Sequence, residues 1–210
     1  KIHVLHVTTK EEVDFLAMHK KNVTFETTPQ HLTLYAPDCY DKLGTYAQMN
    51  PPLRSKEHYD RLWLAIKNNI VDVLGSDHAP HLKKNKEKEY PESPSGMPGV
   101  QTIFPVMIDH VNNGRLTLNQ LVNLMCENPC KIFGIKNKGY IKEGNDADLT
   151  IVDMKKEVTI KNEMIASKCG WTPFHNYKVK GFPVGTIING NLVMADGKIL
   201  IESKGKPLQF

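Results

Sequence analysis

Short strand-like runs alternate with helix-like runs along about the first two-thirds of the chain, and this alternation constrains the fold more than any other feature. Strands rich in β-branched, aromatic and other apolar residues are predicted at 2–7, 23–27, 46–50 and 70–74. Helices are predicted at about 9–22, 55–69, 100–111, 116–125 and 129–133. Alternation of this kind predicts an α/β fold with a parallel sheet covered by helices.

Local signals mark where several of these helices begin. Thr9 and Glu12 have the spacing of a capping box, in which each side chain satisfies a free backbone N–H at the helix start. Ser55 can cap the helix that carries Tyr59, Leu62 and Trp63. These signals fix helix starts more firmly than helix ends.

The pattern changes after Gly139. Further strands are predicted at 148–153, 186–189, 192–194 and 198–201, and Asp196-Gly197 is typical of a tight hairpin turn. We therefore place a boundary near 136–144, which divides the chain into an α/β domain at 1–138 and a β domain at 139–210.

Composition excludes several classes of protein. The net charge of +4 is mild, and the lysine-rich run 83–89 is mixed in sign, so nucleic-acid binding is not indicated. No apolar run reaches the ~20 residues of a membrane helix. The four cysteines form no CxxC pair, which favours a reduced, cytoplasmic protein. Because the chain opens directly in a strand-like run, we expect it to begin inside a longer protein.

Polar side chains follow the predicted strands at the point where each strand ends. They are His6, His31, Asn50, Asp77, and His81 beyond Asp77. In a (β/α) barrel, the carboxyl ends of the strands and the loops after them build the active site. These residues are therefore the candidates for the chemistry of the chain.

His6, His31 and Asp77 are the residue types that bind zinc through imidazole nitrogen and carboxylate oxygen. Each also has an ordinary interpretation, because a single histidine in a strand is more often structural and Asp77 could cap a turn. His3 should point to the opposite face from His6. We interpret four further histidines as structural, namely His19, His58, His110 and His175.

Four strings make the pattern more specific. They are residues 5–11 (LHVTTKE), 26–32 (ETTPQHL), 49–54 (MNPPLR) and 76–81 (SDHAPH). In this order they resemble the second half of a dihydroorotase, a cyclic amidohydrolase. Residues 144–149 (GNDADL) resemble the small β-sandwich that amidohydrolases append to their barrel. The resemblance covers essentially the whole chain.

The resemblance implies a fold and a set of roles. The fold would be the second half of a TIM-type (β/α)8 barrel, strands 5–8, followed by strands of a small β-sandwich. His6 and His31 would bind zinc, one or two ions per site, and Asp77 would bind metal and act as the acid–base. Many relatives carry His at the position of Gln30. The substrate would be held by Asn50, His81, Ser95 and Gly96.

The activity implied by the resemblance is the reversible conversion of N-carbamoyl-L-aspartate and dihydroorotate in pyrimidine synthesis. Two alternatives stay open: a hydantoinase- or allantoinase-like ring hydrolase, and an inactive homologue that scaffolds a partner such as a transcarbamoylase. A homodimer is equally compatible. Asn50 and His81 favour dihydroorotase, because hydantoinases typically have Ser before the Pro-Pro-Leu-Arg string and lack the second His of SDHAPH.

Several parts of the family's site have no match in the chain. They are a His-x-His pair, an Arg and an Asn for the substrate, and a bridging carboxylate on the fourth barrel strand. We therefore expect an N-terminal half to complete the barrel and the chain alone to be inactive. The loop at 83–95 could be a mobile lid or an idle surface loop.

Overall fold

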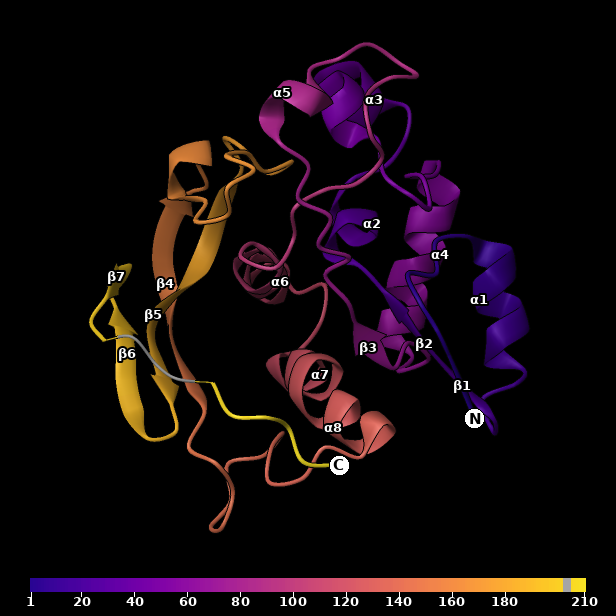
Figure 1. The fold of residues 1–210 in the computed structure, drawn as a ribbon. Helices are drawn as coiled ribbons and strands as arrows, with labels where there is room; N and C mark the ends of the chain where they lie inside the picture. The colour runs from indigo at the N-terminus through magenta and orange to yellow at the C-terminus, as the bar shows by residue number, and fades with distance from the viewer. Residues whose placement is uncertain (202–204) are drawn as a thin grey trace.

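The computed structural model describes residues 1–201 and 205–210 of the chain. Two separate sheets organise it (Figure 1). The first sheet is parallel, in the order β1-β2-β3, and consists of β1 (Ile2–Val4), β2 (Val23–Thr27) and β3 (Val73–Leu74). The second is antiparallel, in sequence order, and consists of β4 (Leu149–Thr159), β5 (Lys178–Ile188), β6 (Asn191–Ala195) and β7 (Lys198–Ile199).

Helices surround the parallel sheet and connect its strands. They are α1 (Lys10–Ala17), α2 (Pro29–Thr33), α3 (Asp38–Leu43), α4 (Lys56–Lys67), α5 (Lys83–Lys86), α6 (Ile103–Asn112), α7 (Leu118–Val122) and α8 (Asn128–Phe133). Shorter turns are the 3-10 segments η1 (Gly44–Ala47) and η3 (Asn162–Met164) and the π-helical segment η2 (Asn123–Glu127). The capping box predicted for Thr9 and Glu12 is confirmed at the start of α1.

The prediction of a strand at 46–50 is wrong. Part of this segment lies in η1, and the described chain has three parallel strands instead of the four predicted. β2 pairs directly with β3, with Thr27 opposite Leu74, so no position is left between them for another strand. The apolar residues Ala47 and Met49 are buried instead in a small core with Trp171.

Strand lengths also differ from the prediction. β1 stops at Val4 instead of residue 7, and β4 and β5 each run for eleven residues, much longer than expected. β5 contains Gly181, Pro183 and Gly185, which are poor strand formers and which hid its length in the sequence. Register shifts in its pairing with β4 accommodate these residues.

One main core lies between the parallel sheet and its helices. It combines Phe25 of β2 with Val13 of α1, Leu62 and Ile66 of α4, and Ile108 of α6, all almost fully buried. Apolar burial of this kind contributes about 25 cal/mol per Å² and is the main force that holds the helices on the sheet.

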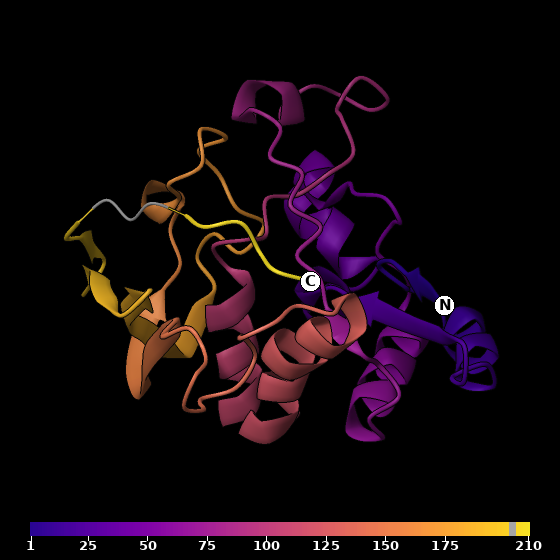
Figure 2. The same ribbon diagram turned by 60° about the horizontal axis from the view of Figure 1, so that its bottom comes forward.

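Helix α6 joins the two regions and lies between the parallel strands and the antiparallel sheet (Figures 1 and 2). The Asp109 carboxylate of α6 accepts a hydrogen bond from the Lys180 N–H of β5 at 2.9 Å. Asn112 donates to the Lys180 carbonyl at 2.7 Å. At Gly181, an added Cβ would lie 2.1 Å from Cγ2 of Ile108, so β5 and α6 pack with no room for a side chain.

The predicted domain boundary falls in the connection between α8 and β4. None of the helices in the described ranges combines the length and apolarity needed to cross a membrane.

Candidate active site

The carboxyl ends of the three parallel strands meet at one edge of the sheet. Backbone hydrogen bonds continue beyond the strands: Val7 N–H donates to the Glu26 carbonyl at 2.8 Å, and Gly75 N–H donates to the Thr27 carbonyl at 3.0 Å. The buried Thr27 hydroxyl donates to the Val7 carbonyl at 3.0 Å. These bonds bring the segments that carry His6, His31 and Asp77 to the same edge, as predicted.

His6 and Asp77 share an uncommon backbone conformation. Their φ angles are +36° and +40°, in the left-handed region that only a few per cent of residues other than Gly adopt. Both side chains are half-buried. Such strained positions cluster at functional sites, where surrounding structure holds the residue in place. The feature therefore supports these two residues as parts of a site, independently of their chemical type.

His31 is held differently, because both of its ring nitrogens are occupied. Nε2 lies 3.1 Å from the Pro51 carbonyl oxygen, which can only accept, so Nε2 carries the proton. Nδ1 then accepts from the Thr28 hydroxyl at 2.8 Å. Burial lowers the pKa of His31 to about 4, so the ring is neutral at physiological pH. In this arrangement no lone pair of His31 is free for a metal.

Gln30, the neighbour of His31, is also buried and lies next to the loop that carries Asp77. Its Nε2 donates to the Ser76 carbonyl at 3.0 Å, one residue before Asp77. Its Oε1 is buried with no hydrogen-bond partner in the described part of the chain. The sequence strings point to His31 rather than Gln30, and only the packing shows how closely Gln30 approaches the Asp77 loop.

Three of the predicted substrate-binding residues come together in the loop after β3. Nε2 of His81 donates to the Ser95 carbonyl at 3.0 Å, and Nδ1 of the ring makes no hydrogen bond within residues 1–201 and 205–210. Gly96 has a φ of +142°, and an added Cβ would lie 2.7 Å from the Cβ of Ala79 and 2.9 Å from Nε2 of His81. A side chain at position 96 would clash with the His81 ring, so the backbone can pass this close to the ring only with glycine there.

Asn50 and His78 stand apart from that group. Asn50 is exposed, just before Pro51, whose carbonyl contacts His31. The His78 Nδ1 accepts hydrogen bonds from Gly99 N–H at 3.1 Å and Val100 N–H at 3.4 Å. His78 thus acts as a backbone support for the segment that leads into α6.

The residues present fit a metal ion only in part. In residues 1–201 and 205–210, no three His, Cys, Asp or Glu side chains are placed to hold a metal together. The donor types of His6 and Asp77 suit zinc, and both sit at the strand ends. His31 could join them only by giving up one of its two ring hydrogen bonds, to the Pro51 carbonyl or to the Thr28 hydroxyl.

Comparison with known proteins decides the family. A model of the amidohydrolase family matches residues 2–193. The chain belongs to the amidohydrolase family. Among curated relatives, it is 42% identical over 205 residues to a dihydroorotase of Pyrococcus furiosus, covering 97% of the chain and 47% of that protein. It is 41% identical over 206 residues to a dihydroorotase of Pyrococcus abyssi, covering 98% of the chain and 49% of that protein.

The chain spans about half the length of the curated relatives it matches. Among solved structures, an L-hydantoinase (dihydropyrimidinase) from Arthrobacter aurescens matches with a TM-score of 0.90 and 35% identity, over 95% of the chain and 46% of that protein. An inactive dihydroorotase-like domain from Chaetomium thermophilum matches with a TM-score of 0.71 and 22% identity, over 95% of the chain and 53% of that chain. At that identity the second match shows the fold alone.

Proposed function

We propose that this chain forms part of a zinc-dependent dihydroorotase, which interconverts N-carbamoyl-L-aspartate and dihydroorotate. The observation that carries the proposal is the identity of about 40% to proteins named dihydroorotase over nearly the whole chain. The gathering of His81, Ser95 and Gly96 in one loop supports it, because these are residues to which the resemblance assigns substrate binding.

In this proposal the parallel strands form part of a (β/α)8 barrel. Residues other than the 210 of this sequence complete the barrel. The antiparallel sheet contributes to the appended β-sandwich. Completion is required because the described chain supplies no full metal-binding group of its own. The 210 residues alone should therefore be inactive. The complete enzyme would act on its small-molecule substrate in the cytoplasm, where a homodimer or a transcarbamoylase partner are the assemblies to test.

The chain's own residues have defined tasks in the proposed reaction. His6 and Asp77 would hold zinc, with His31 a third candidate once one of its ring hydrogen bonds, to Thr28 or to Pro51, is released. When bound, zinc activates water and polarises a carbonyl. Asp77 accepts the proton of the attacking water and passes it to the leaving ring nitrogen, which is general acid–base catalysis.

The substrate is held by the loop residues. The His81 ring is fixed through the bond from Nε2 to the Ser95 carbonyl, and Nδ1 is the ring atom proposed to face the substrate carboxylate. Asn50 offers an amide. The Ser95 carbonyl and the Gly96 N–H are already bonded to the His81 ring and the Gln48 carbonyl, so the Ser95 N–H and the Gly96 carbonyl are the backbone groups proposed for the amide edge of the ring. Without a side chain at Gly96, a flat ring can approach the backbone closely.

A second candidate function is hydrolysis of a hydantoin-type ring, because the solved structure of an L-hydantoinase superposes on the chain with a TM-score of 0.90. Dihydroorotate differs from hydantoin and allantoin in carrying a carboxylate on the ring. The substrate that the complete enzyme turns over therefore separates the two functions.

The test is an assay of the complete enzyme on dihydroorotate, hydantoin and allantoin, before and after removal of metal by a chelator, with elemental analysis of the purified protein. We expect dihydroorotate to be the best substrate and activity to disappear with the metal and return with zinc. Preference for hydantoin or allantoin would replace the proposed function with the second candidate. Absence of turnover on all three rings would indicate an inactive homologue.

A further inference from the structure

Lys86 is buried completely, which is exceptional for a lysine. Its Nζ donates to the Gln48 carbonyl at 2.9 Å and to the Pro94 carbonyl at 2.7 Å. The ammonium group also lies over the Trp171 ring, 5.6 Å from its centroid. Two carbonyls and an aromatic face replace the water around the charge. Burial nevertheless lowers the pKa of Lys86 to about 8.

Both carbonyls that Lys86 binds belong to segments with proposed substrate contacts. The Gln48 carbonyl also accepts the Gly96 N–H at 3.0 Å, and the Gln48 side chain donates to the Ser95 hydroxyl at 3.2 Å. Pro94 immediately precedes Ser95, whose carbonyl accepts from His81. The ammonium group is thus the common anchor of the chain on either side of Ser95.

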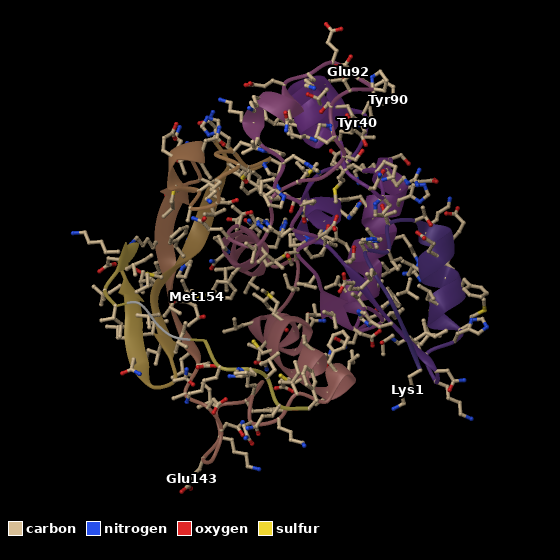
Figure 3. All side chains as sticks on the ribbon, in the orientation of Figure 1. Lys1, Tyr40, Tyr90, Glu92, Glu143 and Met154 are labelled. Atoms are coloured by element: carbon tan, nitrogen blue, oxygen red, sulfur yellow. The ribbon has the colours of Figure 1, made fainter. Side chains whose placement is uncertain are left out.

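Other bonds close the loop around the same point. The Ser93 hydroxyl donates to the Lys86 carbonyl at 3.2 Å. The Trp171 indole, which faces the ammonium, donates to the His81 carbonyl at 2.8 Å. By contrast, Tyr90 and Glu92 are exposed and project from the outer end of the loop (Figure 3). The anchor therefore holds the inner part of the loop, where the substrate residues lie, and leaves its tip free.

We propose that Lys86 is a positioning residue that fixes Ser95, Gly96 and the His81 ring for substrate binding. It acts through the carbonyls of Gln48 and Pro94 and does not touch substrate itself. An apolar residue of the same length would remove the Lys86 donor from the Pro94 carbonyl and leave the Gln48 carbonyl with the Gly96 N–H alone, so the two segments would no longer share a donor and would separate or admit water. This inference rests on the proposed function for the identity of the substrate, although the anchoring itself does not.

The experiment compares Lys86→Met with Lys84→Met in the complete enzyme. Lys84 is an exposed lysine on the same helix, so the control removes the same charge without removing the anchor. Steady-state kinetics on dihydroorotate and hydrogen–deuterium exchange of residues 93–97 are measured for both. We expect Lys86→Met to raise KM about tenfold or more with kcat nearly unchanged and to speed exchange of the Gly96 amide, while Lys84→Met matches the parent.

Unchanged KM and unchanged Gly96 exchange in folded Lys86→Met would overturn the proposal. A parent enzyme inactive on dihydroorotate would contradict the proposed function instead, and exchange at Gly96 would then decide the anchoring role alone. If Lys86→Met does not fold, Lys86→Gln, which retains a donor, is measured in the same way. Failure of both variants to fold would also overturn the proposal, because Lys86 would then support the whole domain and not the position of this loop.

Discussion

The parallel and the antiparallel regions both place aspartate in the left-handed backbone region, for different reasons. In the antiparallel sheet, Asp196 has a φ of +46° and is followed by Gly197 in a hairpin turn, so the turn itself requires the conformation. In the parallel region, Asp77 has a φ of +40° just after a strand, where no hairpin follows. The same backbone conformation is required by a turn in one region and falls on a proposed site residue in the other.

The two regions also differ in strand length and in the residues they carry. In the antiparallel sheet, β4 and β5 each run for eleven residues, whereas β6 and β7 have five and two. Large apolar side chains such as Ile199 are exposed there, and the region carries none of the proposed catalytic residues. The parallel strands are two to five residues long and lead into segments that carry His6, His31 and Asp77. We infer that the antiparallel region has a structural role. The strand ends of the parallel region carry the residues of the proposed reaction.

The largest expected effect separates the two aspartates. Asp77→Asn removes the proposed acid–base, so we expect kcat to fall roughly 100- to 10,000-fold. Asp196→Asn makes the same change at a similar φ, and we expect kcat within about twofold because its contact with Lys156 is on the surface. Asparagine tolerates the left-handed region, so both variants should fold. Equal losses of kcat would remove the distinction between the two regions.

The contact between the regions can be tested at two glycines with positive φ. Gly181→Ala places a Cβ against Ile108 at 2.1 Å, whereas Gly190→Ala meets nothing within 4 Å. Both variants carry backbone strain of about 1–2 kcal/mol. Gly181→Ala adds overpacking of about 1–3 kcal/mol. Denaturant unfolding of the complete protein should show the larger loss for Gly181→Ala, and equal losses would mean that β5 and α6 are not tightly packed.

The core behind the site should give the fold a dependence on pH. Burial lowers the pKa of His110 to about 4, and its Nε2 lies 2.9 Å from the Thr33 hydroxyl. The unfolded histidine titrates near 6.5, so its contribution to stability is fully present above that pH and is lost as pH falls towards 4. Over this pH range, the lowered pKa of His110 should reduce the free energy of unfolding by at most about 3 kcal/mol. Unfolding free energies from pH 7 to 4 should show a shallower fall in His110→Gln, and an unchanged fall would contradict this.

The smallest expected effect concerns the start of α1. Thr9→Ala removes the capping box with Glu12 and should lower the unfolding free energy by about 1 kcal/mol. Thr150→Ala, at an exposed position of β4, should change it by less than about 0.5 kcal/mol. Similar values for both would indicate that the capping bonds contribute little in the parallel region. Thermal or denaturant unfolding gives both numbers.

The sequence predicts best the features that depend on neighbours along the chain. The strand at Val23–Thr27, the capping box of Thr9 and the Asp196-Gly197 turn are all confirmed. Each is set by residues within a few positions of one another. The positions of His6 and Asp77 at strand ends also follow from the pattern, because parallel strands bring their carboxyl ends to one edge.

The features that the sequence misses depend on distant packing. The residues at 46–50 have a sequence pattern typical of a strand, but the apolar ones among them are packed in a small core with Trp171. The length of β5 is hidden by Gly181 and Pro183, whose suitability depends on α6 and on register shifts with β4. No local signal shows that both nitrogens of His31 are occupied or that Lys86 is buried. The metal-binding roles of His6, His31 and Asp77 stay predictions.

The most direct test of the account measures kcat/KM of the complete enzyme for dihydroorotate and for dihydrouracil, the same ring without the carboxylate, in the parent and in His81→Asn. We predict that the parent enzyme prefers dihydroorotate by at least about tenfold in kcat/KM, the value of one charge-assisted hydrogen bond. In His81→Asn this preference should disappear, because activity on dihydroorotate is lost. Equal activity on both rings in the parent, or a preference that survives in His81→Asn, would contradict the account.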